Sequence, residues 1–169
     1  MTSLTLFTKL TGKQVFLQPF ALTDITPEYI GWLNDPLVVR YSNQRFITHN
    51  QASCQRYFSS FRDSPNLFIS IRMKENDLAV GTMTAYTTPY HGRANVGIMI
   101  GHRSLWGRGV GHDAWVTLVN WLAEQACIRK ISGGAMSCNV SMIKIMEKSG
   151  MLHEATLTGE EMLDGVPQN

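Results

Sequence analysis

The sequence has 169 residues, of which 44% are apolar, and a formal net charge of +2, so it predicts one globular domain over residues 1–169 with a full hydrophobic core. The small, dispersed positive charge argues against a nucleic-acid-binding protein. The three cysteines form no CxxC pair, and there is neither a secretory leader nor a run of ~20 apolar residues, so we expect a cytoplasmic protein that does not contact membranes.

The N-terminal part of the chain predicts a strand, two helices and three further strands. Thr26 as cap, Pro27 at the first helical position and the early acid Glu28 begin a helix that ends near residue 34. Apolar residues on one face predict a second helix over residues 50–61. Residues 37–49, between the helices, are either a loop and short helix that line a site or an ordinary solvated loop. Alternating and β-branched residues predict strands over residues 15–20, 67–73, 78–87 and 93–100.

A loop with three glycines at alternate positions then leads into an amphipathic helix. Gly107, Gly109 and Gly111 permit positive φ and leave the backbone bare, so successive N–H groups can turn toward one anion. The first amides of a helix lack partners and favour phosphate, and Arg103 and Arg108 add positive charge nearby. From residue 113 onward the apolar residues of one helical face are Trp115, Leu118, Val119, Leu122 and Ala126.

Spacing separates three phosphate-binding motifs to which this loop could belong. A P-loop requires Lys and then Ser or Thr after its last glycine, but His112 and Asp113 stand there. A dinucleotide fingerprint requires a glycine at the position of His112 and an acid at the end of the next strand, whereas residues 128–138 contain no Asp or Glu. What remains is W-G-R-G-V-G at residues 106–111, whose plain alternative is a glycine-rich turn that merely ends a strand.

The rest of the chain predicts a strand over residues 129–138 and a short helix that Asn139 caps and Gly150 ends. A further strand is expected over residues 151–157, followed by a turn and a short extension. Up to residue 150 the order of elements is βααβββαβα.

This order and the glycine motif resemble those of the GNAT acetyltransferases over roughly residues 13–155. The pyrophosphate loop of that family has the form Gln/Arg-x-x-Gly-x-Gly/Ala, and Trp106 in its first position resembles the branch of ribosomal-protein-alanine N-acetyltransferases. Asn139 also matches the asparagine of N-x-x-S/A…E-K-x-G-F, and EKSGM follows at residues 147–151. The resemblance implies an α/β (α+β) GNAT acyl-CoA N-acyltransferase fold, a mixed central sheet of six or seven strands flanked by about four helices.

The resemblance further implies direct acetyl transfer to a primary amine of a small molecule, with acetyl-CoA as co-substrate and no metal. The backbone of residues 98–100 would pair with the pantetheine arm, the glycine loop would hold the pyrophosphate, and Asn139 would contact the arm or a water near the thioester. The implied cofactor-binding residues are Ile98, Met99, Ile100, Trp106, Gly107, Arg108, Gly109, Val110, Gly111 and Asn139.

The chain departs from its relatives at the groups that usually move protons. Asn95 stands where many of them have a glutamate base, and Met142 and Met146 stand where they have a serine and a tyrosine. Catalysis must therefore rely on positioning and on another proton acceptor, for which His91 and His49 are candidates. The plain alternative for each is an exposed turn histidine. The candidate catalytic residues are Asn139, His91 and Asn95.

The acceptor is predicted from neutral polar and aromatic residues around the expected site. Such groups suit hydroxyl-rich molecules, so we expect an amino sugar or a nucleotide-linked amino sugar, with Arg45 or Arg93 available for a phosphate. A peptide or protein α-amine is the alternative, and the missing family base leaves a catalytically inactive acetyl-CoA sensor or scaffold as another. The predicted acceptor-binding residues are Tyr41, Asn43, Arg45 and Tyr86.

The C-terminus lacks an obvious run for the seventh strand that usually completes the sheet in GNAT relatives. An open sheet edge recruits further strands. We therefore expect residues 158–169 to cover this edge in an irregular path or a second subunit to complete it, as in a homodimer.

Overall fold

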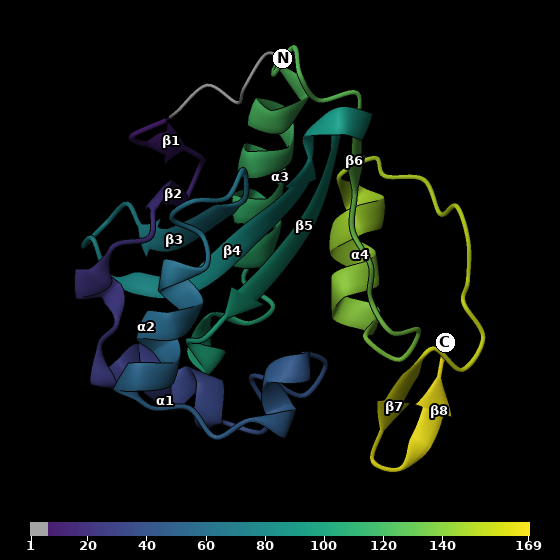
Figure 1. The fold of residues 1–169 in the computed structure, drawn as a ribbon, viewed down its shortest axis with the longest axis horizontal. Coiled ribbons are helices and arrows are strands. Elements are labelled where there is room, and N and C mark those ends of the chain that lie inside the picture. The colour runs from purple at the N-terminus through teal and green to yellow at the C-terminus, as the bar shows by residue number, and fades with distance from the viewer. Residues whose placement is uncertain (1–6) are drawn as a thin grey trace.

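The computed structural model describes residues 7–169 as a six-stranded sheet with helices around it (Figure 1). The strands lie in the order β1-β2-β3-β4-β5-β6, and neighbours are antiparallel except for the parallel pair β5 and β6. The two-residue β1 was not predicted, whereas the next four strands are confirmed to within one residue. The strands are β1 Leu10–Thr11, β2 Val15–Pro19, β3 Leu67–Met73, β4 Ala79–Thr88, β5 Arg93–Ile100 and β6 Lys130–Ser132.

Helices cover both faces of the sheet (Figure 1). The α-helices are α1 Pro27–Asn34, α2 Gln51–Ser59, α3 Val110–Ala123 and α4 Val140–Lys148, and short 3-10 turns include η2 Asn43–Phe46, η3 Pro89–His91 and η4 Arg103–Leu105. The side chains of Thr26, Asn50 and Asn139 each accept a hydrogen bond from the third residue of the helix that follows, which confirms these starts. In the part of the chain described, no helix is both long and apolar enough for a membrane span.

The sheet has a hydrophobic core on each face. Side chains alternate along a strand, so Ile69 and Ile71 of β3 join the core beneath α3, whereas Phe68 joins the core beneath α1 and α2. The residues that α3 buries recur at helical spacing and are Val110, Ala114, Trp115, Leu118 and Leu122. The strands and helices that surround the candidate site described below therefore belong to packed, rigid parts of the fold.

Asp113, in the first turn of α3, fixes the start of this helix to the start of β2. Its carboxylate accepts hydrogen bonds from the backbone N–H groups of Lys13, Gln14 and Val15 at 2.9, 2.7 and 3.0 Å. Three charge-assisted bonds from one turn hold the carboxylate in one geometry. The glycine loop that precedes α3 is consequently anchored from the side of β2.

Of two strand predictions in the last forty residues, one is too long and the other is wrong. The strand expected over residues 129–138 is only the three residues of β6, and residues 151–157 form no strand. Because β6 ends at Ser132, it offers no long edge along which residues 151–157 could pair. The side chains of Leu152 and Leu157 are 88% and 60% exposed, so the apolar alternation there does not correspond to burial.

Residues 158–169 were expected to form an irregular extension, but they contain a β-hairpin of β7 Glu161–Leu163 and β8 Val166–Gln168. Asp164 and Gly165 form its turn with φ of 51° and 78°, the two positive values of a type I′ hairpin. The hairpin forms a sheet of its own rather than extending β6. It contacts the segment after α1 through an ion pair between Arg40 and Asp164 at 2.8 Å.

Candidate active site

The parallel strands β5 and β6 separate after a short paired stretch. They pair only from Arg93 opposite Lys130 to Asn95 opposite Ser132, whereas β5 remains paired with β4 along its full length. The side-chain amide of Asn95 donates to the hydroxyl of Ser132 at 3.1 Å, across the last paired position. Beyond it, the edge of β5 from residue 96 to residue 100 has no strand partner, which leaves room for an extended ligand to lie against its backbone.

The glycine loop has the backbone geometry of an anion site. Gly107 and Gly109 adopt φ of +74° and +82°, and Gly109 is the cap residue of α3. Among residues 7–169, the N–H groups of residues 109–112 make no hydrogen bond. These unpaired donors at the positive end of the helix dipole suit a phosphate. Arg108 is exposed beside them, whereas Arg103 pairs with Asp35 at 3.4 Å.

Trp106 joins the glycine loop to the end of β5. Its indole N–H donates to the carbonyl oxygen of Ile100 at 2.9 Å, and its side chain is 45% exposed. This hydrogen bond therefore fixes the position of the glycine loop relative to the unpaired edge of β5.

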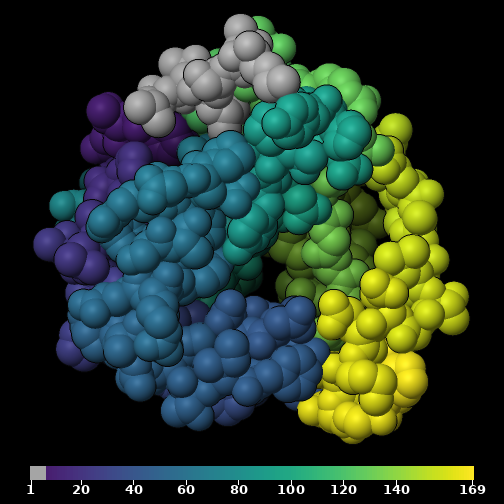
Figure 2. Space-filling model, in the orientation of Figure 1, coloured from purple at the N-terminus to yellow at the C-terminus, as the bar shows by residue number. Residues whose placement is uncertain are grey.

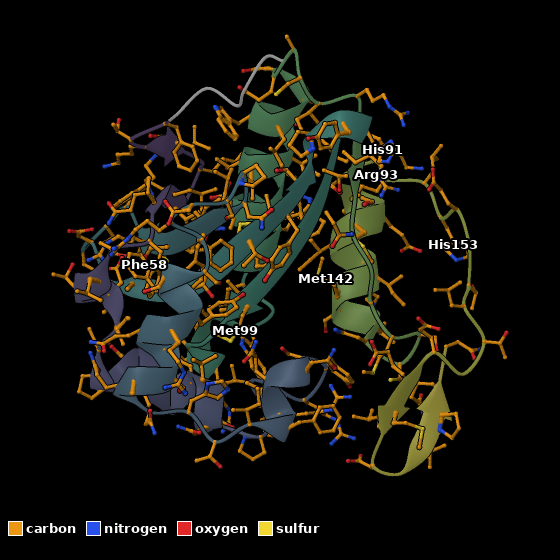
Figure 3. All side chains as sticks on the ribbon, in the orientation of Figure 1. Phe58, His91, Arg93, Met99, Met142 and His153 are labelled. Carbon is orange, nitrogen blue, oxygen red and sulfur yellow. The ribbon has the colours of Figure 1, made fainter. Side chains whose placement is uncertain are left out.

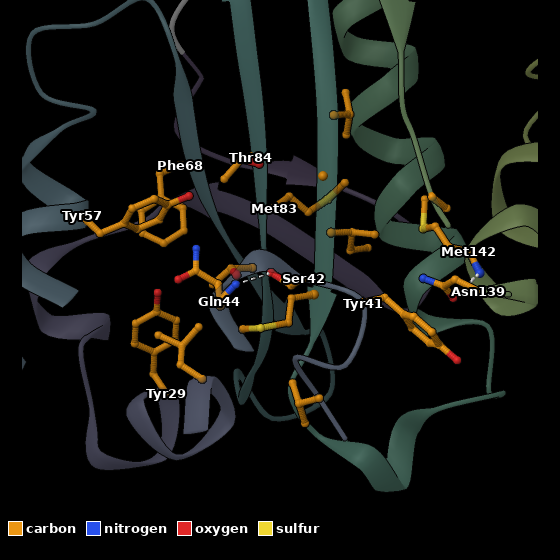
Figure 4. A pocket seen from close by; sticks show the side chains of 18 of the residues that line it. Tyr29, Tyr41, Ser42, Gln44, Tyr57, Phe68, Met83, Thr84, Asn139 and Met142 are labelled. Atoms are coloured by element: carbon orange, nitrogen blue, oxygen red, sulfur yellow. Dashed lines mark hydrogen bonds between the residues drawn. The ribbon is translucent and has the colours of Figure 1, made fainter. Parts of the chain in front are cut away.

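A cavity of about 320 Å³ lies on the α1–α2 side of β5. Its wall combines α1, the segment of residues 38–49, α2, strands β3 to β5, and the connection from β6 to α4. Figure 2 shows the surface hollowed between the central strands and the C-terminal segment. In Figure 4, Tyr29, Gln44 and Tyr57 lie on one side of this cavity and Asn139 and Met142 on the other. The site-lining alternative for residues 37–49 is therefore the one that the structure supports.

Among residues 7–169, the cavity wall contains no Asp, Glu, Lys or Arg. Burial raises the pKa of Tyr29 and of Tyr57 above the usual range of tyrosine, so both hydroxyls stay protonated at neutral pH. The Tyr57 hydroxyl lies 2.8 Å from that of Tyr86. Burial also raises the pKa of the Cys54 thiol, which keeps it uncharged and a weak nucleophile. The described wall therefore offers polar groups but no carboxylate, ammonium or guanidinium group.

Several residues predicted from the sequence come together here. Ile98, Met99, Tyr41 and Asn139 all line the cavity, and Met142 does so as well. Asn139 also caps α4, since its Oδ1 accepts the N–H of Met142 at 3.3 Å. The capping alternative and the site alternative for Asn139 are therefore compatible.

The predicted catalytic residues His91 and Asn95 do not line the cavity. His91 is exposed in η3, and Figure 3 shows it with Arg93 at the opposite end of β5 from Met99. The prediction of His91 as proton acceptor thus loses its geometric basis. Asn95 uses its amide to join β5 to β6, which is a structural bond at the point where the strands separate.

Three predicted acceptor-binding residues also lie outside the wall. The Arg45 guanidinium donates to the carbonyl oxygens of Ser42 at 2.7 Å and of Met162 at 2.6 Å, so it joins η2 to the C-terminal hairpin. Asn43 lies beside Arg45. Tyr86 does not line the cavity, but its hydroxyl is hydrogen-bonded to that of Tyr57, which does.

Sequence reasoning missed Tyr29, Tyr57 and Thr84, which line the cavity. The two tyrosines stand on apolar helix faces, where the pattern predicts only packing. No local signal distinguishes a tyrosine with an enclosed hydroxyl from one whose hydroxyl reaches a cavity.

Comparisons with known proteins agree with this geometry. The family described as "Acetyltransferase (GNAT) domain" matches residues 14–152. Among curated protein sequences, none matches the chain.

Solved structures share the fold at low sequence identity. RimL, a ribosomal L7/L12 α-N-protein acetyltransferase in complex with coenzyme A, superposes with a TM-score of 0.83 at 13% identity, covering 95% of this chain and 93% of that one. A GNAT-family acetyltransferase from Bacillus anthracis gives 0.80 at 12% identity, with coverage of 95% and 93%. Spermidine N-acetyltransferase from Vibrio cholerae, in complex with CoA and spermine, gives 0.78 at 14% identity, with coverage of 92% and 90%.

Proposed function

Because the chain belongs to the GNAT acetyltransferase family and is an acetyl-CoA-dependent N-acetyltransferase, we propose that its acceptor is a small, uncharged, hydroxyl-bearing amine, with an amino sugar favoured. The observation that carries this proposal is the cavity wall, which offers hydroxyl, amide and aromatic groups but no charged side chain. Hydroxyl groups of a sugar can exchange hydrogen bonds with such a wall, and its carbon face can pack on aromatic rings.

The size of the cavity supports the same class of acceptor. About 320 Å³ lies at the lower end of the range of small-molecule sites. A polyamine carries several positive charges, and each would enter an uncharged wall without an acidic partner, at a cost in desolvation. An amino sugar has a single amino group, so only one positive charge must be lost before it reacts.

On the co-substrate side, we propose that residues 106–111 hold the pyrophosphate of acetyl-CoA and that the free edge of β5 holds the pantetheine arm. The unpaired amides of residues 109–112 and the positive φ of Gly107 and Gly109 fit the first role. The separation of β5 from β6 after Asn95 fits the second. Asn139 stands where it can contact the arm, since it lines the cavity at the start of α4.

A nucleotide-linked acceptor has less support than a free amino sugar. Arg45, one residue expected to bind its phosphate, already donates to two carbonyl oxygens. Arg93, the other, lies at the far end of β5 (Figure 3). Neither guanidinium faces the cavity.

Two alternatives remain distinct from this proposal. A peptide or protein α-amine is the first, and the likeness to RimL is its only specific support. An acetyl-CoA sensor or scaffold without turnover is the second, and it rests on Asn95, Met142 and Met146 in place of the usual proton-moving groups.

Thiol release from acetyl-CoA should be followed with panels of amino sugars, nucleotide-linked amino sugars, polyamines and peptides, with calorimetry of acetyl-CoA binding in parallel. We expect turnover with the highest kcat/KM on an amino sugar. A clear preference for peptides would replace the acceptor class, and binding without any turnover would favour the sensor.

A further inference from the structure

Acetylation of an amine requires a group that takes up a proton. An amine is mostly protonated at neutral pH, and only its neutral form attacks a thioester. No carboxylate lines the cavity, and Asn95 cannot act as a base. The titratable side chains of the wall are Tyr29, Tyr41, His49, Cys54 and Tyr57.

Of these groups, only His49 has the chemistry of a proton acceptor near neutral pH. Buried tyrosines and a buried thiol with raised pKa values hold their own protons. Tyr41 is a phenol, which has no basic nitrogen. An imidazole, in contrast, exchanges its proton in the physiological range.

The ring of His49 is held in one orientation and one tautomer. Its Nε2 lies 3.3 Å from the backbone carbonyl oxygen of Gln44. Because a carbonyl oxygen only accepts, this hydrogen bond places the proton on Nε2 and leaves the lone pair on Nδ1. No donor within residues 7–169 contacts Nδ1.

Asn34, the last residue of α1, holds the backbone of His49 from the other side. Its Oδ1 accepts the N–H of His49 at 2.8 Å, and its Nδ2 donates to the carbonyl oxygen of His49 at 2.9 Å. The same Nδ2 donates to the carbonyl oxygen of Ile30 at 3.0 Å, which fixes the amide on α1. The Asn34 side chain thus bonds both the N–H and the carbonyl oxygen of His49, as the backbone of a neighbouring strand would.

We propose that His49 is the proton acceptor of the transfer reaction and that Asn34 is its positioning residue. This inference rests on the proposed acetyltransferase function and names the base that the family positions lack. The ammonium group of the acceptor gives one proton to Nδ1 of His49, directly or through one water. Its nitrogen then bonds to the acetyl carbon as the carbon–sulfur bond breaks, and the departing sulfur takes a second proton from nitrogen. The products are the amide, the CoA thiol and an imidazolium that returns its proton to solvent.

The first test replaces His49 with glutamine, whose amide can still donate to the Gln44 carbonyl oxygen but accepts no proton. We expect H49Q to bind acetyl-CoA with unchanged affinity while kcat falls by 10²–10⁴, the usual size for loss of a general base. The decline in wild-type rate at acid pH, where imidazole is protonated, should disappear in H49Q. The matched control is H153Q, because His153 lies in the segment after α4 and outside the cavity (Figure 3).

The second test separates positioning from mere stability. Asn34→Asp keeps an acceptor for the His49 N–H but loses both donated bonds. We expect N34D to lower kcat about tenfold with an unchanged KM for acetyl-CoA, and to have no further effect on kcat in the H49Q background. A purely structural role for Asn34 would instead lower the activity of H49Q and of the wild type equally.

The inference is overturned if H49Q retains kcat within about threefold of wild type, or if the loss appears in H91Q instead. Nitrogen NMR of the His49 ring gives a readout that does not need turnover: we expect the Nε2–H tautomer, and the Nδ1–H tautomer would also overturn the inference. Absence of wild-type turnover on every amine would overturn the acetyltransferase proposal itself, whereas turnover with an unaffected H49Q would overturn the role of His49 alone.

Discussion

The two halves of the site are built in different ways. The proposed CoA half consists of β5, the glycine loop and the start of α3, which follow one another within residues 96–112, and the groups it offers to a ligand are backbone amides. The proposed acceptor half takes side chains from α1, residues 38–49, α2, the strands β3 to β5 and the start of α4. A local backbone site can be recognised as a motif, whereas a site made of distant side chains cannot. The comparison predicts that changes in one half should leave the function of the other intact.

Among the changes that test this comparison, the largest effect is expected from Gly109→Val. A β-branched residue at φ of +82° is strained by about 1–3 kcal/mol, and relief of that strain would turn the amides at the start of α3 away from the phosphates. Affinity for acetyl-CoA should fall about 10–100-fold in calorimetry, with little change in acceptor preference. Gly31→Ala is the control, because no atom lies within 4 Å of the added carbon and φ is not positive. A folded G109V protein with wild-type affinity would show that the loop does not hold the pyrophosphate.

A smaller effect should come from a charge placed in the acceptor half. Thr84→Asp adds a carboxylate to the uncharged wall, which should favour a polycationic amine over a neutral-bodied amino sugar. We expect the ratio of kcat/KM values for the two acceptors to shift about tenfold, equivalent to about 1.4 kcal/mol, at constant acetyl-CoA affinity. Thr158→Asp on the exposed C-terminal segment should change neither quantity. An unaltered ratio of kcat/KM values in T84D would show that this cavity does not recognise the acceptor.

The bond between Asn95 and Ser132 joins β5 and β6 where the two halves meet. Asn95→Ala should lower the free energy of unfolding by about 1 kcal/mol and reduce kcat far less than the 10²–10⁴-fold loss of a general base. Ser132→Ala removes the same 3.1 Å bond, so the double variant should be little worse than either single one. A full-sized loss of kcat in N95A alone would mean that Asn95 organises an essential water.

The smallest effect concerns the free edge of β6, the last strand of the sheet. The C-terminal hairpin forms a separate sheet, so the described chain adds no strand there, and a second subunit could do so. We expect weak, concentration-dependent self-association in sedimentation experiments, without loss of activity on dilution. A strict monomer whose β6 amides exchange as slowly as those of β3 would show that the edge needs no partner.

The sequence predicted the fold well where patterns are local. Strands β2 to β5 and the caps Thr26 and Asn139 were found because alternation and capping depend on neighbouring residues. The sequence failed after α4. The alternation of residues 151–157 indicated a strand that has no partner, and the Asp164-Gly165 segment was interpreted as a turn and a short extension although it specifies a hairpin.

By itself, the sequence predicted the GNAT family and the place of the proposed phosphate site, because a glycine loop before a helix creates its amide donors within a few residues. Only the tertiary structure decided which histidine reaches the acceptor cavity. The sequence favoured His91 over His49, but η3 lies at the far end of β5 (Figure 3), whereas Asn34 and Gln44 hold His49 against the cavity. The position of a side chain relative to a site depends on contacts between segments distant in sequence, and a local pattern does not record them.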